Sequence, residues 1–172
     1  MTDHLAVVTS VEALDLDRYS GLWYEIGRLP LRWEDVEAAD ITANYTLEDG
    51  GSVRVDNRCI DKGGAPAQAI GRATPVNRRP GQLQVSFLPD FLRWVPFTKG
   101  DYWVLKIDDA YTVALVGTPD HKNLWFLARQ PHIDPATEAD YLGEAVRQGF
   151  DLQQWITPTQ SGGRVTDDLL KG

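Results

Sequence analysis

The residues most able to do covalent chemistry are one cysteine and three histidines. Cys59 is the only cysteine in the chain, and a thiol becomes a nucleophile where a base or a cation lowers its pKa. His4, His121 and His132 fall in the N-terminal segment or in predicted loops, so none is placed beside Cys59. The sequence contains no GxSxG, Walker, GxGxxG or zinc-ligand spacing. We therefore predict that the protein is not an enzyme and has neither a metal site nor a cofactor.

An amide on an apolar strand face is a second candidate for chemistry. Val53, Val55, Asn57 and Cys59 share one face of a predicted strand, opposite charged residues. A buried amide needs hydrogen-bond partners. We therefore expect Asn57 to hold the polar head group of a ligand or a water molecule.

Hydrophobic periodicity predicts the elements that would position these side chains. Four early segments alternate apolar and polar residues, as half-buried strands do. Three later segments are apolar on nearly both faces, so another element must cover their outer side. The predicted strands lie at 21–29, 41–48, 53–59, 67–75, 82–87, 102–107, 111–117 and 124–129. A helix is predicted from Pro135, with Asp134 as its N-cap and Gly149 as its stop.

The short turns between these strands favour one architecture. Consecutive hairpins without a long crossover indicate an all-β, eight-stranded, up-and-down antiparallel β-barrel, with the helix packed outside and a short final strand near 152–156. A barrel of this size can hold one small ligand. We predict a single domain over residues 1–160, followed by a loose C-terminal tail over residues 161–172, which has mixed charge and no periodicity.

Composition narrows the possible partners and compartments. The 172 residues carry a formal net charge of −8, which disfavours binding to nucleic acid or to an anionic membrane surface. No stretch reaches the roughly 18 apolar residues of a membrane-spanning helix. The N-terminal residues show no secretion or lipidation signal. From the sequence as given, the expected location is the cytoplasm.

Three segments carry a family resemblance. "LDLDRYSGLWYEIGRL", "GDYWVLKIDDAYTVALVGTPDHKNLWFLARQP" and "GFDLQQW" resemble the lipocalins, most closely the bacterial lipocalins similar to apolipoprotein D. The resemblance covers about Val11 to Trp155. It implies that Gly21 and Trp23 lie at the closed end of the barrel, with Arg129 packed across the indole, and it matches Tyr111 to the family's middle motif. It also implies a cell-envelope or periplasmic location if a leader has been removed.

The resemblance and the strand alternation together define a candidate ligand site. Its members face the barrel interior or belong to the apolar segment "FLPDFLRWVPFTKGDYW", which family analogy places at the open end. The candidate ligand-binding residues are Tyr45, Val55, Asn57, Cys59, Ala69, Gly71, Val85, Phe87, Trp94, Phe97, Trp103 and Leu105. The open-end aromatics suit a lid, a contact with the barrel itself or a homodimer contact.

We interpret the chain as a protein that binds, transports or stores a small hydrophobic ligand, with a fatty acid or a lysophospholipid favoured. One alternative is a lipocalin-type enzyme, an isomerase or hydrolase that acts on a lipophilic substrate through Cys59. Another is a pigment or haem binder. A barrel filled by its own side chains is also open, because eight strands lie at the threshold of holding a ligand.

Overall fold

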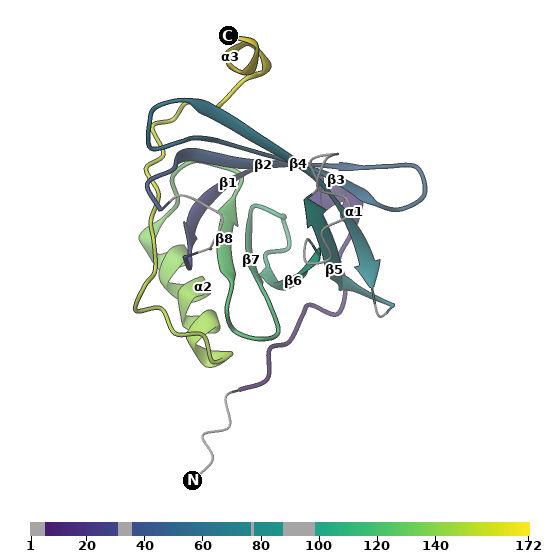
Figure 1. Cartoon of the computed structure of the whole chain (residues 1–172). Helices are drawn as coiled ribbons and strands as arrows, with labels where there is room; N and C mark the ends of the chain where they lie inside the picture. Colours follow the sequence, from purple (N-terminus) through teal and green to yellow (C-terminus); the bar gives the residue numbers. More distant parts are fainter. Residues whose placement is uncertain (1–5, 31–35, 77, 88–98) are drawn as a thin grey trace.

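Antiparallel strands close into a barrel in the part of the chain that the computed structural model describes, residues 6–30, 36–76, 78–87 and 99–172. Each strand pairs with the next one along the chain, and β8 pairs with β1 (Figure 1). The described strands are β1 (Gly21–Arg28), β2 (Ala39–Leu47), β3 (Val53–Ile60), β4 (Pro66–Val76), β5 (Arg79–Phe87), β6 (Lys99–Ile107), β7 (Val113–Gly117) and β8 (Leu124–Ala128). The predicted eight-stranded up-and-down barrel is confirmed.

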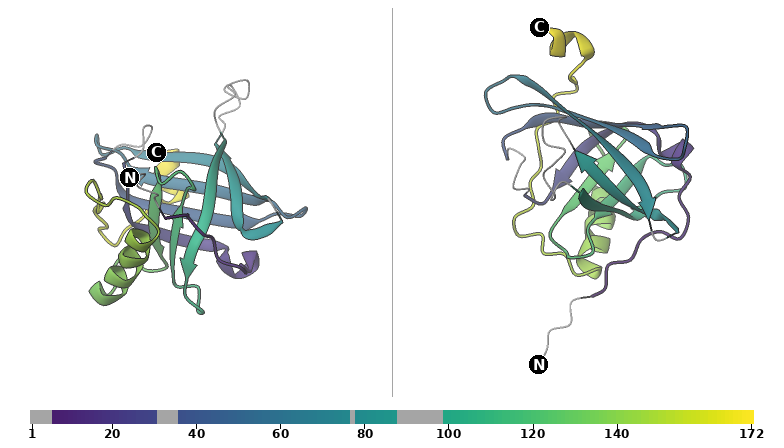
Figure 2. Two further views of the ribbon diagram at one scale, coloured as in Figure 1. Left: turned by 90° about the horizontal axis from the view of Figure 1, so that it is seen from below. Right: turned by 45° about the vertical axis from the view of Figure 1, so that its right-hand side comes forward.

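Three helices accompany the barrel in the described residues: α1 (Leu16–Tyr19), α2 (Pro135–Arg147) and α3 (Asp167–Lys171). Helix α2 begins where the sequence predicts, because the Asp134 side chain accepts a hydrogen bond from the Thr137 amide at 3.3 Å. It lies against the outside of the barrel (Figure 2). No described helix has both the length and the apolar character that crossing a membrane requires.

Two hydrophobic clusters occupy the two faces of the barrel wall. The inner cluster includes Trp23, Val55 and Val104, and it fills the closed half of the barrel. The outer cluster joins β7 and β8 to α2 through side chains such as Phe126 and Tyr141. Fully burying an apolar side chain of this size stabilises a fold by about 1.5–3 kcal/mol. The outer cluster therefore explains why three apolar strands need α2.

A C-terminal segment completes the wall where β1 and β2 separate. The ladder between these strands runs only from Gly21↔Tyr45 to Tyr24↔Thr42. Beyond it, Gln160 Nε2 donates to the carbonyls of Glu25 at 2.8 Å and Ile41 at 3.1 Å. We call residues 155–161 the C-terminal strap. It seals the seam between the two strands on the way from α2 to α3 (Figure 1).

The strap also contacts the mouth-side end of β1 directly. Arg28 and Ile156 exchange two backbone hydrogen bonds of 3.0 and 2.8 Å. The short final strand predicted near 152–156 is therefore a single bridge. The Trp155 ring lies so close to Gly27 that a Cβ atom there would be 2.3 Å from Trp155 Cζ2. This position requires glycine because any side chain would displace the indole.

The N-terminal segment seals a second part of the wall, along β6. The Val11 amide donates to the Val104 carbonyl at 2.8 Å, and Gln82 Nε2 donates to Ser10 Oγ at 3.1 Å. Gln148, at the end of α2, accepts from the Thr9 amide at 2.9 Å. Segments at both ends of the described chain are therefore part of the barrel wall.

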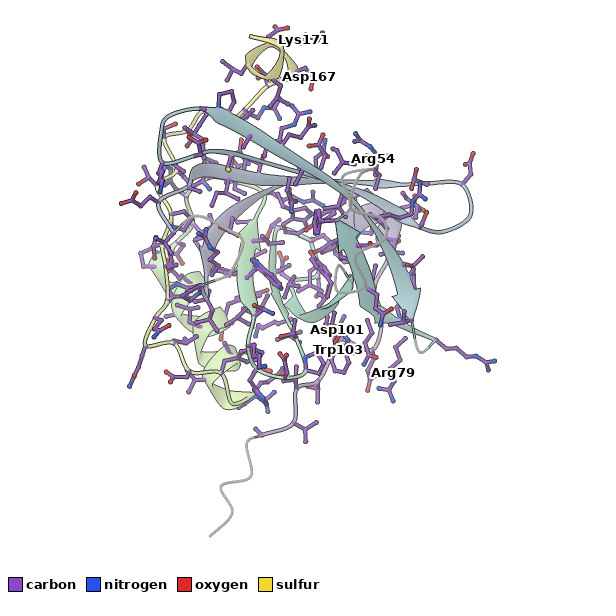
Figure 3. The ribbon with its side chains drawn as sticks, viewed as in Figure 1. Arg54, Arg79, Asp101, Trp103, Asp167 and Lys171 are labelled. Carbon is purple, nitrogen blue, oxygen red and sulfur yellow. The ribbon has the colours of Figure 1, made fainter. Side chains whose placement is uncertain are left out.

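The final residues make contacts that the sequence did not predict. We expected residues 161–172 to be a loose tail, and they contain helix α3, drawn outside the barrel with Asp167 and Lys171 labelled in Figure 3. Val165 is buried, and Arg58 on β3 binds Asp167 with an Nη2–Oδ1 distance of 2.6 Å. The segment is thus attached to the outer face of β3.

Candidate functional site

The floor of the barrel is closed by Trp23 and Arg129. Trp23 is fully buried, and its Nε1 donates to the Tyr19 carbonyl at 2.8 Å. The Arg129 guanidinium carbon lies 3.8 Å from the indole centroid, which is cation–π geometry. Gly21 has a φ of +102°, and a Cβ there would come within 3.2 Å of Arg129 Nη1. The floor is thus a structural plug.

Arg129 also ties the floor to the surrounding chain by donating to four backbone carbonyls. The acceptors are Tyr111 at 3.0 Å, Leu22 at 3.0 Å, Arg18 at 2.8 Å and Tyr19 at 3.3 Å. Tyr111 takes part again through its hydroxyl, which accepts from the Asp15 amide at 2.9 Å. One side chain therefore holds segments that lie far apart in sequence.

Asp108 shapes the turn between β6 and β7, a role the sequence reasoning missed. Its carboxylate accepts from the amides of Thr112 at 2.6 Å and Val113 at 2.9 Å, and from the Thr112 hydroxyl. Burial acts to raise the pKa of Asp108, but these hydrogen bonds outweigh it and lower the pKa. The Asp-Asp-Ala-Tyr-Thr turn could have indicated this role, because aspartates often accept hydrogen bonds from the backbone of tight turns.

Three tyrosines fill the barrel above the floor. The Tyr102 hydroxyl lies 2.5 Å from that of Tyr19 and 2.8 Å from that of Tyr45, and the Tyr102 ring stacks on Trp125 at 6.3 Å. Burial is the main cause that raises the pKa of each tyrosine in this triad. A cavity of about 10 Å³ beside them has room for one water. The closed half is therefore filled with aromatic rings.

A buried ion pair lies in the same interior. Arg28 Nη1 and Glu25 Oε2 are 2.8 Å apart, and both side chains are almost completely buried. Arg28 pairs with Trp125 across β1 and β8, and Glu25 pairs with Leu127 of the inner cluster. The two charges face inward because a β-bulge follows Glu25. Simple alternation places Arg28 on the outside, so the sequence reasoning missed this pair.

The inner faces of β3 and β4 bring several predicted ligand residues together toward the mouth. Their register pairs Val55 with Gly71 and Asn57 with Ala69. Phe87 lies over Gly71, since a Cβ there would be 2.8 Å from Phe87 Cδ1. Exposure rises along this face, from buried Val55 through half-buried Asn57 to exposed Ala69. The mouth-side part of this face therefore carries small side chains and is the less buried part of the two strands.

Asn57 has an unsatisfied amide in this part of the lumen. Its Oδ1 is buried and has no hydrogen-bond partner among the described residues. Buried side-chain oxygens are usually paired, so this atom is available to a donor from a ligand or a water. Cys59 lies further along the same face, half-buried and outside any disulfide.

The remaining predicted ligand residues fall into three groups. Tyr45 and Val85 belong to the inner cluster of the closed half. Trp103 and Leu105 were wrongly placed in the lumen, because both belong to the outer cluster with α2. β6 is apolar on both faces, and the side chains that turn inward are Tyr102 and Val104. Two further predicted residues, Trp94 and Phe97, lie outside the described residues.

The described histidines contact neither the lumen nor each other. His121 Nε2 lies 2.8 Å from the Gln148 carbonyl at the end of α2, and its ring packs against Phe150 of the outer cluster. His132 is exposed after β8. Among the described residues, no group of three histidine, cysteine or acidic side chains has the geometry to bind a metal ion.

Comparisons with known proteins agree with this geometry. A family model described as "lipocalin-like domain" matches residues 14–160. The chain is 36% identical over 154 residues to temperature-induced lipocalin-1 of Arabidopsis thaliana, which covers 88% of this chain and 82% of that protein. It is 37% identical over 158 residues to outer membrane lipoprotein Blc of Escherichia coli strain K12, covering 90% and 84%.

Solved structures share the fold at lower sequence identity. Lobster apocrustacyanin A1 aligns with a TM-score of 0.67 at 11% identity, covering 94% of each chain. Insecticyanin from the tobacco hornworm Manduca sexta aligns with a TM-score of 0.67 at 19% identity, covering 96% of this chain and 88% of that one. These alignments establish the architecture of the barrel and of the helix beside it.

Proposed function

The chain belongs to the lipocalin family, and on that premise we propose that it binds a single-chain lipid, a fatty acid or a lysophospholipid, in the open half of its barrel. The observation that carries the proposal is the inner face of β3 and β4. This face combines small side chains at Ala69 and Gly71 with the unpaired Asn57 Oδ1. Because Phe87 covers Gly71, the place for a hydrocarbon chain is beside the exposed Ala69, and Asn57 supplies one acceptor for a polar group.

The tyrosine triad limits how deep such a ligand reaches. Tyr19, Tyr45 and Tyr102 are tied to one another by hydroxyl contacts and packed against Trp23 and Trp125. Displacing them would break hydrogen bonds among buried groups, which costs about 1–3 kcal/mol for each unsatisfied group. The acyl chain therefore ends above the triad. Each buried methylene contributes about 0.8 kcal/mol to affinity.

Binding, rather than catalysis, is the activity that these contacts support. The polar groups of the interior are mostly engaged with each other, as the Glu25–Arg28 pair and the tyrosine triad show. Asn57 can orient a ligand but carries no nucleophile. Transport or storage of the lipid is the role that follows from a one-site barrel.

Titration of delipidated protein with oleic acid and with lysophosphatidylcholine tests the proposal. We expect saturable binding at one molecule per barrel. Calorimetry measures the affinity, and the fluorescence of Trp125, whose ring packs against Tyr102 and the inner cluster, reports binding inside the barrel. Ala69→Trp fills the lumen and should abolish binding. The matched control is Thr74→Trp, which places the same ring on the exposed face of β4. Absence of saturable binding to either lipid, or undiminished binding by Ala69→Trp, would overturn the proposal.

A second pair of variants tests the polar contact. Asn57→Ala should weaken the binding of lysophosphatidylcholine roughly five-fold, because its free glycerol hydroxyl can donate to Oδ1 and one hydrogen bond is lost. Asn44→Ala removes the same amide from the exposed face of β2 and should leave the affinity unchanged. Equal affinities for the two variants would remove Asn57 from the site while leaving the lumen test intact.

A further inference from the structure

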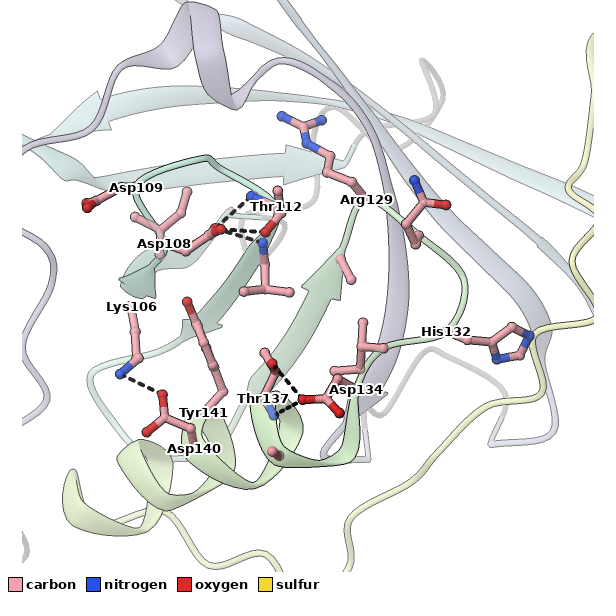
Figure 4. Close-up of a pocket in the computed structure, with 16 residues that line it drawn as sticks. Lys106, Asp108, Asp109, Thr112, Arg129, His132, Asp134, Thr137, Asp140 and Tyr141 are labelled. Atoms are coloured by element: carbon pink, nitrogen blue, oxygen red, sulfur yellow. Dashed lines mark hydrogen bonds and ion pairs between the residues drawn. The ribbon is translucent and has the colours of Figure 1, made fainter.

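A second hollow lies outside the barrel, at its closed end. It has a volume of about 870 Å³ and is open to solvent between the first half of α2 and the β6–β7 hairpin (Figure 4). We call it the outer cleft. The wall that separates it from the lumen includes β6, β7 and β8. Its volume is within the range of small-molecule sites, so its lining decides which ligand it suits.

Tyr141 of α2 supplies an unpaired hydroxyl to the outer cleft. The residue is only 4% exposed, and its ring stacks on Phe126 at 5.3 Å. Figure 4 draws no hydrogen bond between its hydroxyl and the other residues of the lining, and it shows the hydroxyl directed toward Asp108. The ring is buried, but the hydroxyl oxygen is not among the solvent-excluded atoms that lack a partner, so it faces the open cleft. This hydroxyl is therefore available to a bound molecule.

The charges around this hydroxyl are mostly negative. Asp108, Asp109, Asp134 and Asp140 line the outer cleft. Asp108 and Asp140 line the outer cleft together with Tyr141, and their carboxylates add to the effect of burial in raising its pKa. An anionic ligand would be repelled here, because close like charges are unfavourable at low solvent exposure.

Arg129, whose charge interacts with Asp108, and Lys106 cancel only part of the charge of the four aspartates. Arg129 directs its donors to backbone carbonyls at the barrel floor. Lys106 lies at the cleft, where its Nζ is 3.2 Å from Asp140 Oδ2 and 5.0 Å from the centroid of the Tyr141 ring. The chain thus already places one ammonium group between a carboxylate and this aromatic face. Of the other three aspartates, Asp108 and Asp134 accept backbone hydrogen bonds and contribute their negative charge only.

We infer that the outer cleft binds an organic ammonium ion with an apolar body. The ammonium group donates a hydrogen bond to the Tyr141 hydroxyl oxygen and is attracted by the aspartates, as the Lys106 ammonium is. The apolar body lies against Ile133 and Val113, which belong to the apolar part of the lining. The site is separate from the lumen and does not depend on the lipid proposal.

Three aromatic probes of similar shape test the charge requirement. We expect 2-phenylethylammonium to bind at one molecule per chain, measured by calorimetry and by NMR shifts of Tyr141. Neutral 2-phenylethanol and anionic 3-phenylpropionate should bind at least about ten-fold more weakly. Binding of the ammonium probe should weaken in ~1 M salt, where charges are screened within about 3 Å. Equal binding of the neutral alcohol would overturn the inference.

Variants locate the probe and distinguish a ligand site from a purely structural cluster. Tyr141→Phe keeps the ring and should weaken binding about five- to ten-fold, the effect of one hydrogen bond to a charged donor. Lys106→Met removes the competing ammonium and should tighten binding at least about two-fold. Asp151→Asn, which neutralises an exposed aspartate outside the cleft, should have no effect.

The opposite signs expected for Tyr141→Phe and Lys106→Met make the test decisive, since general damage to the fold cannot tighten binding. Unchanged affinity in either variant would overturn the inference. The lumen-filling Ala69→Trp variant must bind the ammonium probe as the unmodified protein does. Loss of binding there would place the probe in the barrel and overturn the outer site.

Discussion

At the scale of single residues, the barrel floor depends on one guanidinium group. Arg129 stacks on Trp23 and donates to carbonyls from α1, β1 and the β6–β7 turn. The planar guanidinium of arginine can donate to several acceptors in fixed directions at once, whereas the ammonium of lysine is a compact charge on a flexible side chain. The floor therefore requires arginine at this position and not merely a positive charge.

We expect Arg129→Lys to lower the free energy of unfolding by about 2–4 kcal/mol, because it leaves the part-buried carbonyls of Tyr111 and Leu22 without the guanidinium donors. Urea denaturation followed by tryptophan fluorescence measures the change. Arg79→Lys is the matched control, since Arg79 is exposed on β5 (Figure 3), and surface substitutions usually change stability by less than about 0.5 kcal/mol. Similar values for the two variants would show that the carbonyl contacts contribute little.

The residues of the lumen show how far the sequence could lead. Tyr45, Val55 and Asn57 follow strict alternation on regular strands, so their inward direction could be read from period two. Arg28 faces inward only because a bulge after Glu25 shifts the inward–outward alternation of β1. No local sequence pattern predicts that bulge. On β6 both faces are apolar, so the sequence pattern does not distinguish inward from outward residues. Packing against α2 makes the difference: Tyr102 and Val104 belong to the inner cluster, and Trp103 and Leu105 to the outer one.

At the scale of elements, the strands and α2 were predictable, but the two terminal segments were not. Repeated alternation of apolar and polar residues predicts the strands, and the N-cap and the spacing of apolar residues predict α2. The C-terminal strap has neither property, because it acts through single contacts: the amide of Gln160, the ring of Trp155 and one bridge at Ile156. Contacts between distant segments leave no periodic trace in a sequence.

We expect Gln160→Leu to destabilise the seam between β1 and β2 by about 2–3 kcal/mol, because the carbonyls of Glu25 and Ile41 lose a buried donor. Hydrogen exchange should accelerate at the Arg28 and Asp40 amides, which donate to the strap. Gln153→Leu, at an exposed position before the strap, is the control. Unchanged exchange at both amides would show that the strap holds without its glutamine.

At the scale of the whole molecule, buried tyrosines link stability to alkaline pH. Burial raises the pKa of Tyr19, Tyr45 and Tyr102 above the ordinary value of 10.0. The contribution of these buried tyrosines to the free energy of unfolding is therefore fully present below pH 10. It is lost as the pH rises, because the unfolded chain releases these protons first.

We expect the free energy of unfolding to fall above pH 10 by about 1.4 kcal/mol per pH unit for each such tyrosine. Denaturation at a series of pH values measures the slope, and phenolate absorbance reports ionisation. Tyr102→Phe removes one titrating group and should make the slope shallower by that amount. A slope that is the same with and without Tyr102 would contradict this linkage.

The strap also sets an order of events during synthesis. Residues 155–161 leave the ribosome after all eight strands, yet they close the seam between β1 and β2. Domains fold as units while their chains emerge, so a nascent chain that has exposed only the strands has an incomplete wall at the mouth. The seam between β1 and β2 is closed only once the strap has been made, so a ligand bound earlier would occupy a barrel with an open side.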